Sequence, residues 1–217
     1  MMFFVYHNVL AGILIMGGYS SSERRSVEYW SPAEQGNCIL NDHPRQMQYP
    51  TVNLVSGRLV SCCDETCEIY QEGSWQHLQN TTVERAHHSS ATTKDAVLLI
   101  GGLVLDGANV APTNTTEWIP LDGSPPHPGP FTTRHGGFHC TIQISPDVVV
   151  VTGGCWDLQS HDGCSEDYVT EYQLNDGKET PLTPLVRSRY AHACGVYQDA
   201  AGQQVRHCSW KHSVSFV

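Results

Sequence analysis

Nine cysteines and twelve histidines are the residues of this chain with the greatest capacity for chemistry. Paired cysteines form disulfides in oxidising compartments, and both residue types bind transition metals. Structural zinc requires two close pairs of ligands. The cluster CCDETC at 62–67 provides one such pair, but no second pair follows at the usual distance. Disulfide formation is therefore the chemistry that we expect of the cysteines.

The histidines recur in similar surroundings. Three segments begin with an arginine, continue with aromatic or histidine residues, and end in small or β-branched residues: RAHHSSA from Arg85, RHGGFHCTI from Arg134 and RYAHACGVY from Arg189. This recurrence favours a structural role for their histidines, which are His87, His88, His135, His139 and His192. The alternative is a metal held by a ring of histidines at the centre of a circular fold.

No catalytic set is recognisable. The chain contains no G-x-S-x-G segment, and its paired glycines are adjacent rather than spaced as in a phosphate-binding G-x-G-x-x-G loop. Asp162, Glu166 and Asp167 are acidic, but they lie among turn residues, where a solvated loop is the simpler interpretation. We assign no catalytic residue, metal ligand or cofactor.

The elements that would position these residues are written as a repeat. An apolar run ends in two glycines in AGILIMGG (11–18), DAVLLIGG (95–102) and DVVVVTGG (147–154), and two cysteines replace the glycines in SGRLVSCC (56–63). The structural glycines are Gly17, Gly18, Gly101, Gly102, Gly153 and Gly154. A glutamate next to an aromatic or apolar residue follows each copy, at Glu28, Glu68, Glu117 and Glu171.

The repeated segments indicate β-strands. Continuous apolar runs such as VLLI and VVVV are typical of strands that are buried on both faces. Two consecutive glycines permit positive φ and close approach of neighbouring backbones where the chain leaves the strand. No long segment has helical periodicity. A β-sandwich would explain the short strands, but not three markers that recur in the same order.

The order of apolar strand, double glycine, Glu-aromatic pair and tryptophan resembles the kelch motif of β-propeller proteins over residues 8–205. The resemblance implies an all-β, kelch-type β-propeller with an incomplete ring. The expected blades lie near 8–48, 49–84, 85–133 and 134–188, followed by an incomplete fifth at 189–205 and a divergent tail at 206–217. The second unit departs from the motif by lacking the double glycine, and the tryptophan is clear only at Trp75.

An incomplete ring has consequences for both ends of the chain. Open blade edges predict self-association, because unpaired strand edges recruit other strands. Residues 1–18 are apolar, but they lack the basic start and the small-residue cleavage site of a signal peptide. We expect a first-blade hairpin of MFFVY against AGILIM, with no insertion into a membrane.

The propeller arrangement groups the cysteines into three candidate disulfides. Cys155 and Cys164 bracket the loop after the fourth double glycine, and Cys62 or Cys63 faces Cys67 at the equivalent place in the second unit. Cys140 and Cys194 occupy equivalent strands of adjacent units. The NTT sequons at Asn80 and Asn114, both expected in loops, are glycosylation candidates. Together these features favour a secreted protein, with a cytoplasmic location as the alternative.

The function that we predict is a non-catalytic module that binds a protein or a glycan through its inter-strand loops, at 19–26, 103–114 and 155–167. Trp156 in the last loop either anchors a ligand or packs on a neighbouring loop. The net charge of −10 disfavours nucleic acid and anionic membranes as partners. The alternative is a fragment of a galactose-oxidase-like copper oxidase, although its His and Tyr ligands do not map onto this chain. An intracellular ubiquitin-ligase adaptor would need a dimerisation domain before the blades.

Overall fold

The computed structural model describes residues 2–3, 13–16, 25–31, 36–47, 49–106, 109–156, 166–198 and 204–209. Across these ranges all of the regular structure is β-strand, and the strands form five antiparallel sheets. No helix in the described ranges is long and apolar enough to cross a bilayer. We call the five sheets blades 1 to 5 in chain order.

Blade 1 has the strand order β1–β2–β3–β4. Its strands are β1 (Met2–Phe3), β2 (Ile13–Met16), β3 (Val27–Ser31) and β4 (Gly36–Leu40). β1 pairs antiparallel with β2, with Met2 opposite Ile15, in the hairpin that the apolar start of the chain predicts.

Blade 2 has five strands in the order β11–β10–β7–β6–β5. They are β5 (Thr51–Val55), β6 (Arg58–Gln71), β7 (Ser74–Ala86), β10 (Leu103–Asp106) and β11 (Asn109–Pro112). The β10–β11 hairpin, expected from sequence as a loop of the third unit, joins blade 2 through pairing of Leu103 with Ala86. The segment SWQHL, expected to be a short strand, extends to thirteen residues in β7.

Blades 3 and 4 each have four strands, and blade 5 has two. Blade 3 consists of β8 (Ser89–Thr92), β9 (Ala96–Ile100), β12 (Thr116–Pro120) and β13 (His127–Pro128). Blade 4 consists of β14 (Cys140–Ser145), β15 (Val148–Thr152), β16 (Val169–Gln173) and β17 (Glu179–Pro181). Blade 5 pairs β18 (Ala193–Gln198) with β19 (Gln204–Ser209), so regular pairing continues past the expected start of the tail at 206.

The apolar runs are buried because the strands that contain them are covered on both faces. In β9, Val97 and Leu99 pack in a core shared with Val60 and Ile69 of blade 2. The alternate residues Leu98 and Ile100 pack in a second core with Val149, Val151 and Tyr172 of blade 4. Alternation of side chains along a strand therefore gives each neighbouring blade its own half of the run.

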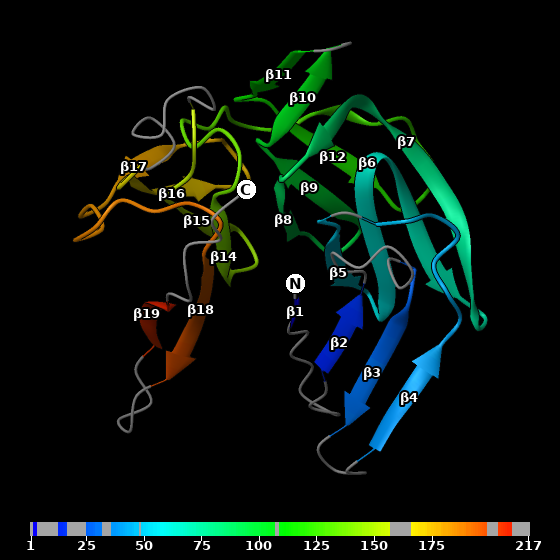
Figure 1. The fold of residues 1–217 in the computed structure, drawn as a ribbon. Helices are drawn as coiled ribbons and strands as arrows, with labels where there is room; N and C mark the ends of the chain where they lie inside the picture. The colour runs from blue at the N-terminus through cyan, green and yellow to red at the C-terminus, as the bar shows by residue number, and fades with distance from the viewer. Residues whose placement is uncertain are drawn as a thin grey trace.

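The blades stand side by side around an axis and form an open arc (Figure 1). β5, β8, β14 and β18 are the first strands of blades 2 to 5, and each contacts the next along the inner side of the arc. The arc is open between blade 1 and blade 5 in this view. The prediction of an all-β, incomplete propeller is confirmed. We call the short segments that precede β5, β8, β14 and β18 the entry segments, and we call the end of the axis at which these four strands begin the mouth.

Candidate functional site

The double glycines allow a histidine of one blade to pack against the preceding blade. A Cβ atom on Gly101 would lie 2.9 Å from Cε1 of His139, and a Cβ on Gly153 would lie 2.7 Å from Cε1 of His192. Both glycines have positive φ, of 56° and 63°. Gly17 and Gly18, the glycines of the first unit, lie outside the described residues.

Three of these histidines link adjacent blades by hydrogen bonds, and we call them the histidine latches. His88 Nε2 is 3.2 Å from Thr51 Oγ1 of blade 2, and His139 Nε2 is 2.7 Å from Ser89 Oγ of blade 3. His192 Nε2 is 2.7 Å from Thr152 Oγ1 of blade 4. Each latch histidine lies just before the first strand of its own blade and forms its hydrogen bond with the preceding blade.

Hydrogen bonds to carbonyl groups fix which nitrogen carries the proton. His88 Nδ1 is 3.2 Å from the Arg85 oxygen, and His139 Nδ1 is 3.1 Å from the Gly136 oxygen. Because a carbonyl only accepts, Nδ1 is protonated and Nε2 accepts from the hydroxyl. Burial lowers the pKa of both His88 and His139 to about 3, so both are neutral at physiological pH.

We expect Gly154→Ala to destabilise the protein by about 3 kcal/mol, because its φ of 120° is unfavourable for alanine and the new Cβ would collide with the His135 carbonyl. The matched control is Gly73→Ala, whose φ is also positive but whose added Cβ would have no neighbour within 4 Å. That change should cost about 1 kcal/mol. Urea unfolding of both variants measures the difference, and equal losses would contradict close packing at the double glycine.

The residue two positions before the first strand of each of blades 2 to 5 (β5, β8, β14 and β18) has a left-handed backbone. Its φ is 59° at Tyr49, 53° at His87, 57° at Phe138 and 51° at Ala191. Such values are strained for residues with a side chain and persist only where the surroundings impose them. Here the backbone is imposed by inter-blade hydrogen bonds, since Phe138 N donates to His87 O at 3.0 Å and Ala191 N donates to Phe138 O at 2.8 Å.

The side chains of these entry segments form a continuous series, which we call the aromatic row: Tyr49, His87, Phe138 and Tyr190. The ring centroids of Tyr49 and His87 lie 4.1 Å apart, and those of His87 and Phe138 lie 3.9 Å apart. Tyr190 meets Phe138 edge to face at 6.1 Å. The first three rings are partly buried and Tyr190 is 39% exposed, so the row reaches solvent.

The row carries no charge near neutral pH. Burial lowers the pKa of His87 to about 4, so its imidazole is neutral. No described residue forms a hydrogen bond with the hydroxyl groups of Tyr49 or Tyr190, which leaves both for another partner. The row therefore combines apolar ring surface with two polar ends, as ligand-contacting surfaces often do.

One arginine marker and one glutamate marker of the repeat meet as a buried ion pair. Arg85 Nη2 lies 3.2 Å from Glu117 Oε2, and both side chains are almost fully buried. In blade 2, Glu68 faces His43 at 3.4 Å and Arg45 at 3.3 Å. Burial lowers the pKa of Arg85, while the charge of Glu117 opposes that change. The Arg85–Glu117 pair joins the end of β7, next to His87, to β12 of blade 3.

The structure contains two of the three expected disulfides. Cys62 is bonded to Cys67, with their Cα atoms 4.1 Å apart, and Cys140 of β14 is bonded to Cys194 of β18, with a Cα distance of 6.1 Å. The second bond links blades 4 and 5. Cys155 is also in a disulfide, but Cys164, its expected partner, lies outside the described residues. Disulfides of this kind are typical of an oxidising, extracellular-type environment.

The other sequence candidates fall into less suitable places. Trp156 is half-buried, and its indole nitrogen donates a hydrogen bond to the Arg134 carbonyl, which supports packing on a neighbouring loop. Most of the candidate loops 19–26 and 155–167 lie outside the described residues. Asn80 is exposed but pairs with Thr66 within the β6–β7 hairpin, so its placement in a loop was wrong. Asn114 is exposed in a loop.

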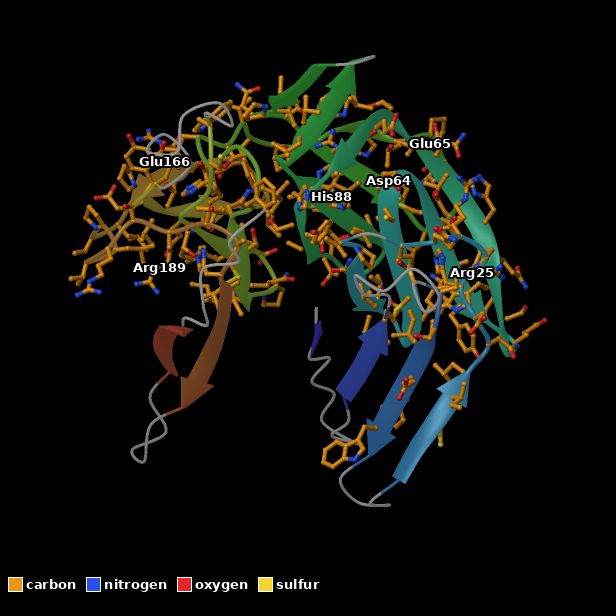
Figure 2. All side chains as sticks on the ribbon, in the orientation of Figure 1. Arg25, Asp64, Glu65, His88, Glu166 and Arg189 are labelled. Carbon is orange, nitrogen blue, oxygen red and sulfur yellow. A yellow bond between two sulfur atoms is a disulfide. The ribbon has the colours of Figure 1, made fainter. Side chains whose placement is uncertain are left out.

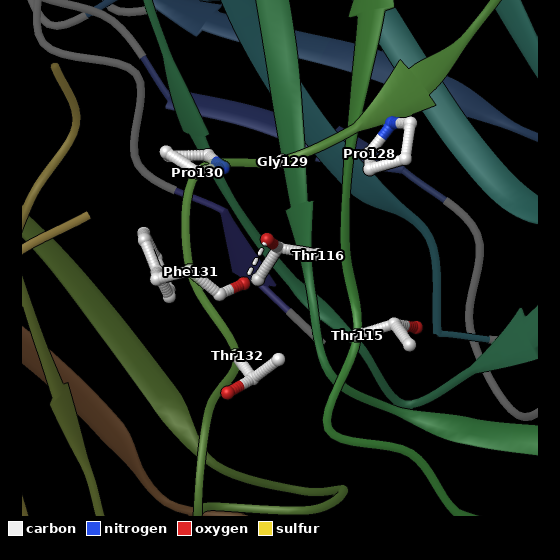
Figure 3. A pocket seen from close by; sticks show the side chains of 7 residues that line it. All are labelled: Thr115, Thr116, Pro128, Gly129, Pro130, Phe131 and Thr132. Carbon is white, nitrogen blue, oxygen red and sulfur yellow. Dashed lines mark hydrogen bonds between the residues drawn. The ribbon is translucent and has the colours of Figure 1, made fainter. Parts of the chain in front are cut away.

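The pockets of the described surface offer little chemistry. One of 320 Å³ lies where segment 128–132 runs along β12 (Figure 3). The segment is tied there by a hydrogen bond of 2.5 Å from Thr116 Oγ1 to Phe131 O. None of its lining residues is titratable: Thr115, Thr116, Pro128, Gly129, Pro130, Phe131 and Thr132. The pocket therefore contains no side chain suited to general acid or base catalysis.

A second pocket, of 590 Å³, separates the β8–β9 and β14–β15 turns. Gln143 closes its inner side, because its amide nitrogen donates to Thr92 O at 2.6 Å and its amide oxygen accepts from Thr92 N at 3.0 Å. Among the described residues no group of three or more His, Cys, Asp or Glu side chains is arranged to hold a metal. The histidine latches thus have structural partners.

Side-by-side antiparallel sheets around an axis define the chain as a partial β-propeller. No family model matches the sequence, and no curated protein sequence matches it. The solved structure titled "Structure of YjhT" has a similar fold, with a TM-score of 0.71 and 12% identity over 90% of this chain and 69% of that chain. At this identity the similarity shows the fold alone.

Sequence reasoning missed the aromatic row. Its members are one residue per repeat and are far apart in the chain, so no local pattern joins them. The usable signal is position: His87 and Phe138 immediately precede the buried latch histidines, and Tyr190 precedes His192 by two residues. In a circular fold, aromatic residues that precede the strand nearest the axis in successive blades are brought close to one another.

Proposed function

We propose that this chain is a non-catalytic, kelch-type binding or scaffold module that engages a protein or glycan partner at the mouth of the propeller axis. The observation that carries the proposal is the aromatic row. Strained backbones in equivalent positions of successive blades, at Tyr49, His87, Phe138 and at Ala191 next to Tyr190, accompany the four rings of the row. Strain of this kind is concentrated at ligand-contacting sites, and aromatic residues dominate binding hot spots.

The setting that we propose is extracellular. The disulfides support secretion, and the exposed Asn80 and Asn114 are suitable acceptors for glycans. Asn80 lies on β7 of blade 2, and Asn114 lies in the loop before β12 of blade 3. The two-stranded blade 5 also supports self-association through a strand edge, which we retain as a proposal.

Selection of a displayed peptide library and a glycan array against the intact protein tests the binding function. Phe138→Leu keeps an apolar side chain but removes the central ring of the row. We expect the selected ligands to lose at least fivefold in affinity for this variant. Tyr70→Leu is the matched control, since Tyr70 belongs to an aromatic pair with Trp75 far from the mouth. Ligands that bind both variants equally well would place the binding surface elsewhere.

A further inference from the structure

Two carboxylates flank the aromatic row. Asp64 pairs in register with Arg85, two residues before His87. Glu166 is held by the backbone of Arg189, next to Tyr190, through a hydrogen bond of 3.0 Å from Arg189 N to Glu166 O. Figure 2 shows Asp64 and Glu166 on the two sides of the axis, with His88 between them. Each carboxylate therefore lies on a segment that pairs with a residue close in sequence to a member of the row, which is His87 for Asp64 and Tyr190 for Glu166.

Neither of these carboxylates forms an ion pair with a described residue. Glu68, Glu117 and Glu179 each form an ion pair, whereas no described Lys, Arg or His nitrogen lies within 4.0 Å of the carboxylate of Asp64 or Glu166, and Arg45 acts on Asp64 only from a greater distance. Burial raises the pKa of Asp64, although a hydrogen bond with Cys63 and the charge of Arg45 oppose this change, and burial followed by the charge of Asp167 raises the pKa of Glu166. A cation brought to either group would relieve this unfavourable environment.

The cations of the chain that lie nearby are already engaged. Arg45 pairs with Glu65 and Glu68, and Arg85 pairs with Glu117. Arg134 pairs with Glu179 at 2.8 Å. The side chain of Arg189 donates a hydrogen bond to the Arg187 carbonyl, and Figure 2 shows the labelled Arg189 apart from Glu166. Burial, followed by the charge of Arg189, lowers the pKa of His192.

We propose that the mouth binds a basic segment of a partner protein, with arginine or lysine side chains lying over the aromatic row and reaching Asp64 and Glu166. This inference rests on the proposed binding function. Aromatic faces attract cations, and the net charge of −10 steers a basic segment toward the surface. The row spans the length of about four to five extended residues at about 3.3 Å each.

Fluorescence anisotropy with labelled, N-acetylated (Gly-Arg)4, (Gly-Gln)4 and (Gly-Glu)4 peptides at physiological salt tests the proposal. We expect only the arginine peptide to bind. The double variant Asp64→Asn/Glu166→Gln should lose at least tenfold in affinity for it, and Phe138→Leu about fivefold. The charge-matched control is Asp95→Asn/Asp147→Asn, which removes two exposed carboxylates in the turns after β8 and β14, at the ends of these strands remote from the entry segments, and should lose less than threefold.

The outcomes separate this inference from the proposed function. Equal losses in the two double variants would show non-specific attraction to an acidic protein and overturn the inference. The glutamine or glutamate peptide could instead bind, with an affinity that Phe138→Leu weakens. That result would overturn the proposal of a basic partner but would retain the mouth as a binding surface. If neither Phe138→Leu nor Tyr190→Leu changes the affinity for the arginine peptide, the inference is overturned as well, because the row would then take no part in binding. Thermal melts establish that each variant is folded.

Discussion

Lowering the pH from 7.5 to 5 is expected to remove most of the stability of the protein. His88, His135 and His139 are buried, and burial lowers their pKa values to about 3, about 4 and about 3. In the unfolded chain these histidines titrate near pH 6.5. Between pH 6.5 and 4 the unfolded chain therefore binds protons that the native state does not. The free energy of unfolding must fall as the pH falls through this window.

The expected effect is large. At pH 5 each of these histidines costs about 2 kcal/mol of stability, and three together approach the total stability of an ordinary domain. His87 and His192, whose pKa values burial lowers to about 4, act in the same direction. Asp64 and Glu166 act in the opposite direction because their pKa values are raised, but they are only partly buried.

Urea unfolding at pH 7.5, 6.5 and 5.5 measures this dependence. The variant His139→Asn should be less stable at pH 7.5, but its stability should fall by about 1.4 kcal/mol less than that of the wild type between pH 7.5 and 5.5. His77→Gln is the control, because His77 is exposed on β7. A stability that stays constant between pH 7.5 and 5.5, or an unchanged slope in His139→Asn, would contradict latches that are neutral in the native state.

The sequence predicts the repeat well because its markers perform the same packing task in each blade. Apolar runs such as 97–100 and 148–151 must be strands covered on both sides, and the structure buries them between neighbouring blades. The arginine and glutamate markers Arg85 and Glu117 meet as a buried ion pair, whereas the marker Arg134 pairs with Glu179, outside the repeat pattern. Each marker is visible alone, but the contact between them depends on the curvature of the arc.

Other features follow from interactions between distant residues. β6 runs through the position where a double glycine would end the strand, since Cys62 and Cys63 stand there and the bond to Cys67 lies within β6. The β10–β11 hairpin joins blade 2 because β7 is long enough to pair with it. The aromatic row arises only when successive blades stack, so no single segment encodes it. The sequence therefore predicts the blades more fully than the mouth that they enclose.

Removing one partner of the Arg85–Glu117 pair is expected to cost about 3–5 kcal/mol of unfolding free energy. Glu117→Ala leaves a guanidinium group buried without its carboxylate, and it also removes the acceptor of the Thr82 amide, which donates to Glu117 Oε1 at 2.7 Å. Arg85 additionally donates to the carbonyl groups of Gly101 and Thr115, both at 3.2 Å. The pair therefore connects β7 of blade 2 to the double glycine and β12 of blade 3.

Arg134→Ala is the matched control, because Arg134 occupies the equivalent repeat position but forms a half-exposed pair with Glu179. Exposed ion pairs contribute about 0–1 kcal/mol, so urea unfolding should show only a small loss in this variant. In the double variant Arg85→Met/Glu117→Met the loss should be smaller than the sum of the single losses, because no buried charge remains unpaired. If Glu117→Ala lowers the free energy of unfolding no more than Arg134→Ala does, the Arg85–Glu117 pair does not hold blades 2 and 3 together. The alignment of the entry segments must then come from the glycine and histidine contacts alone.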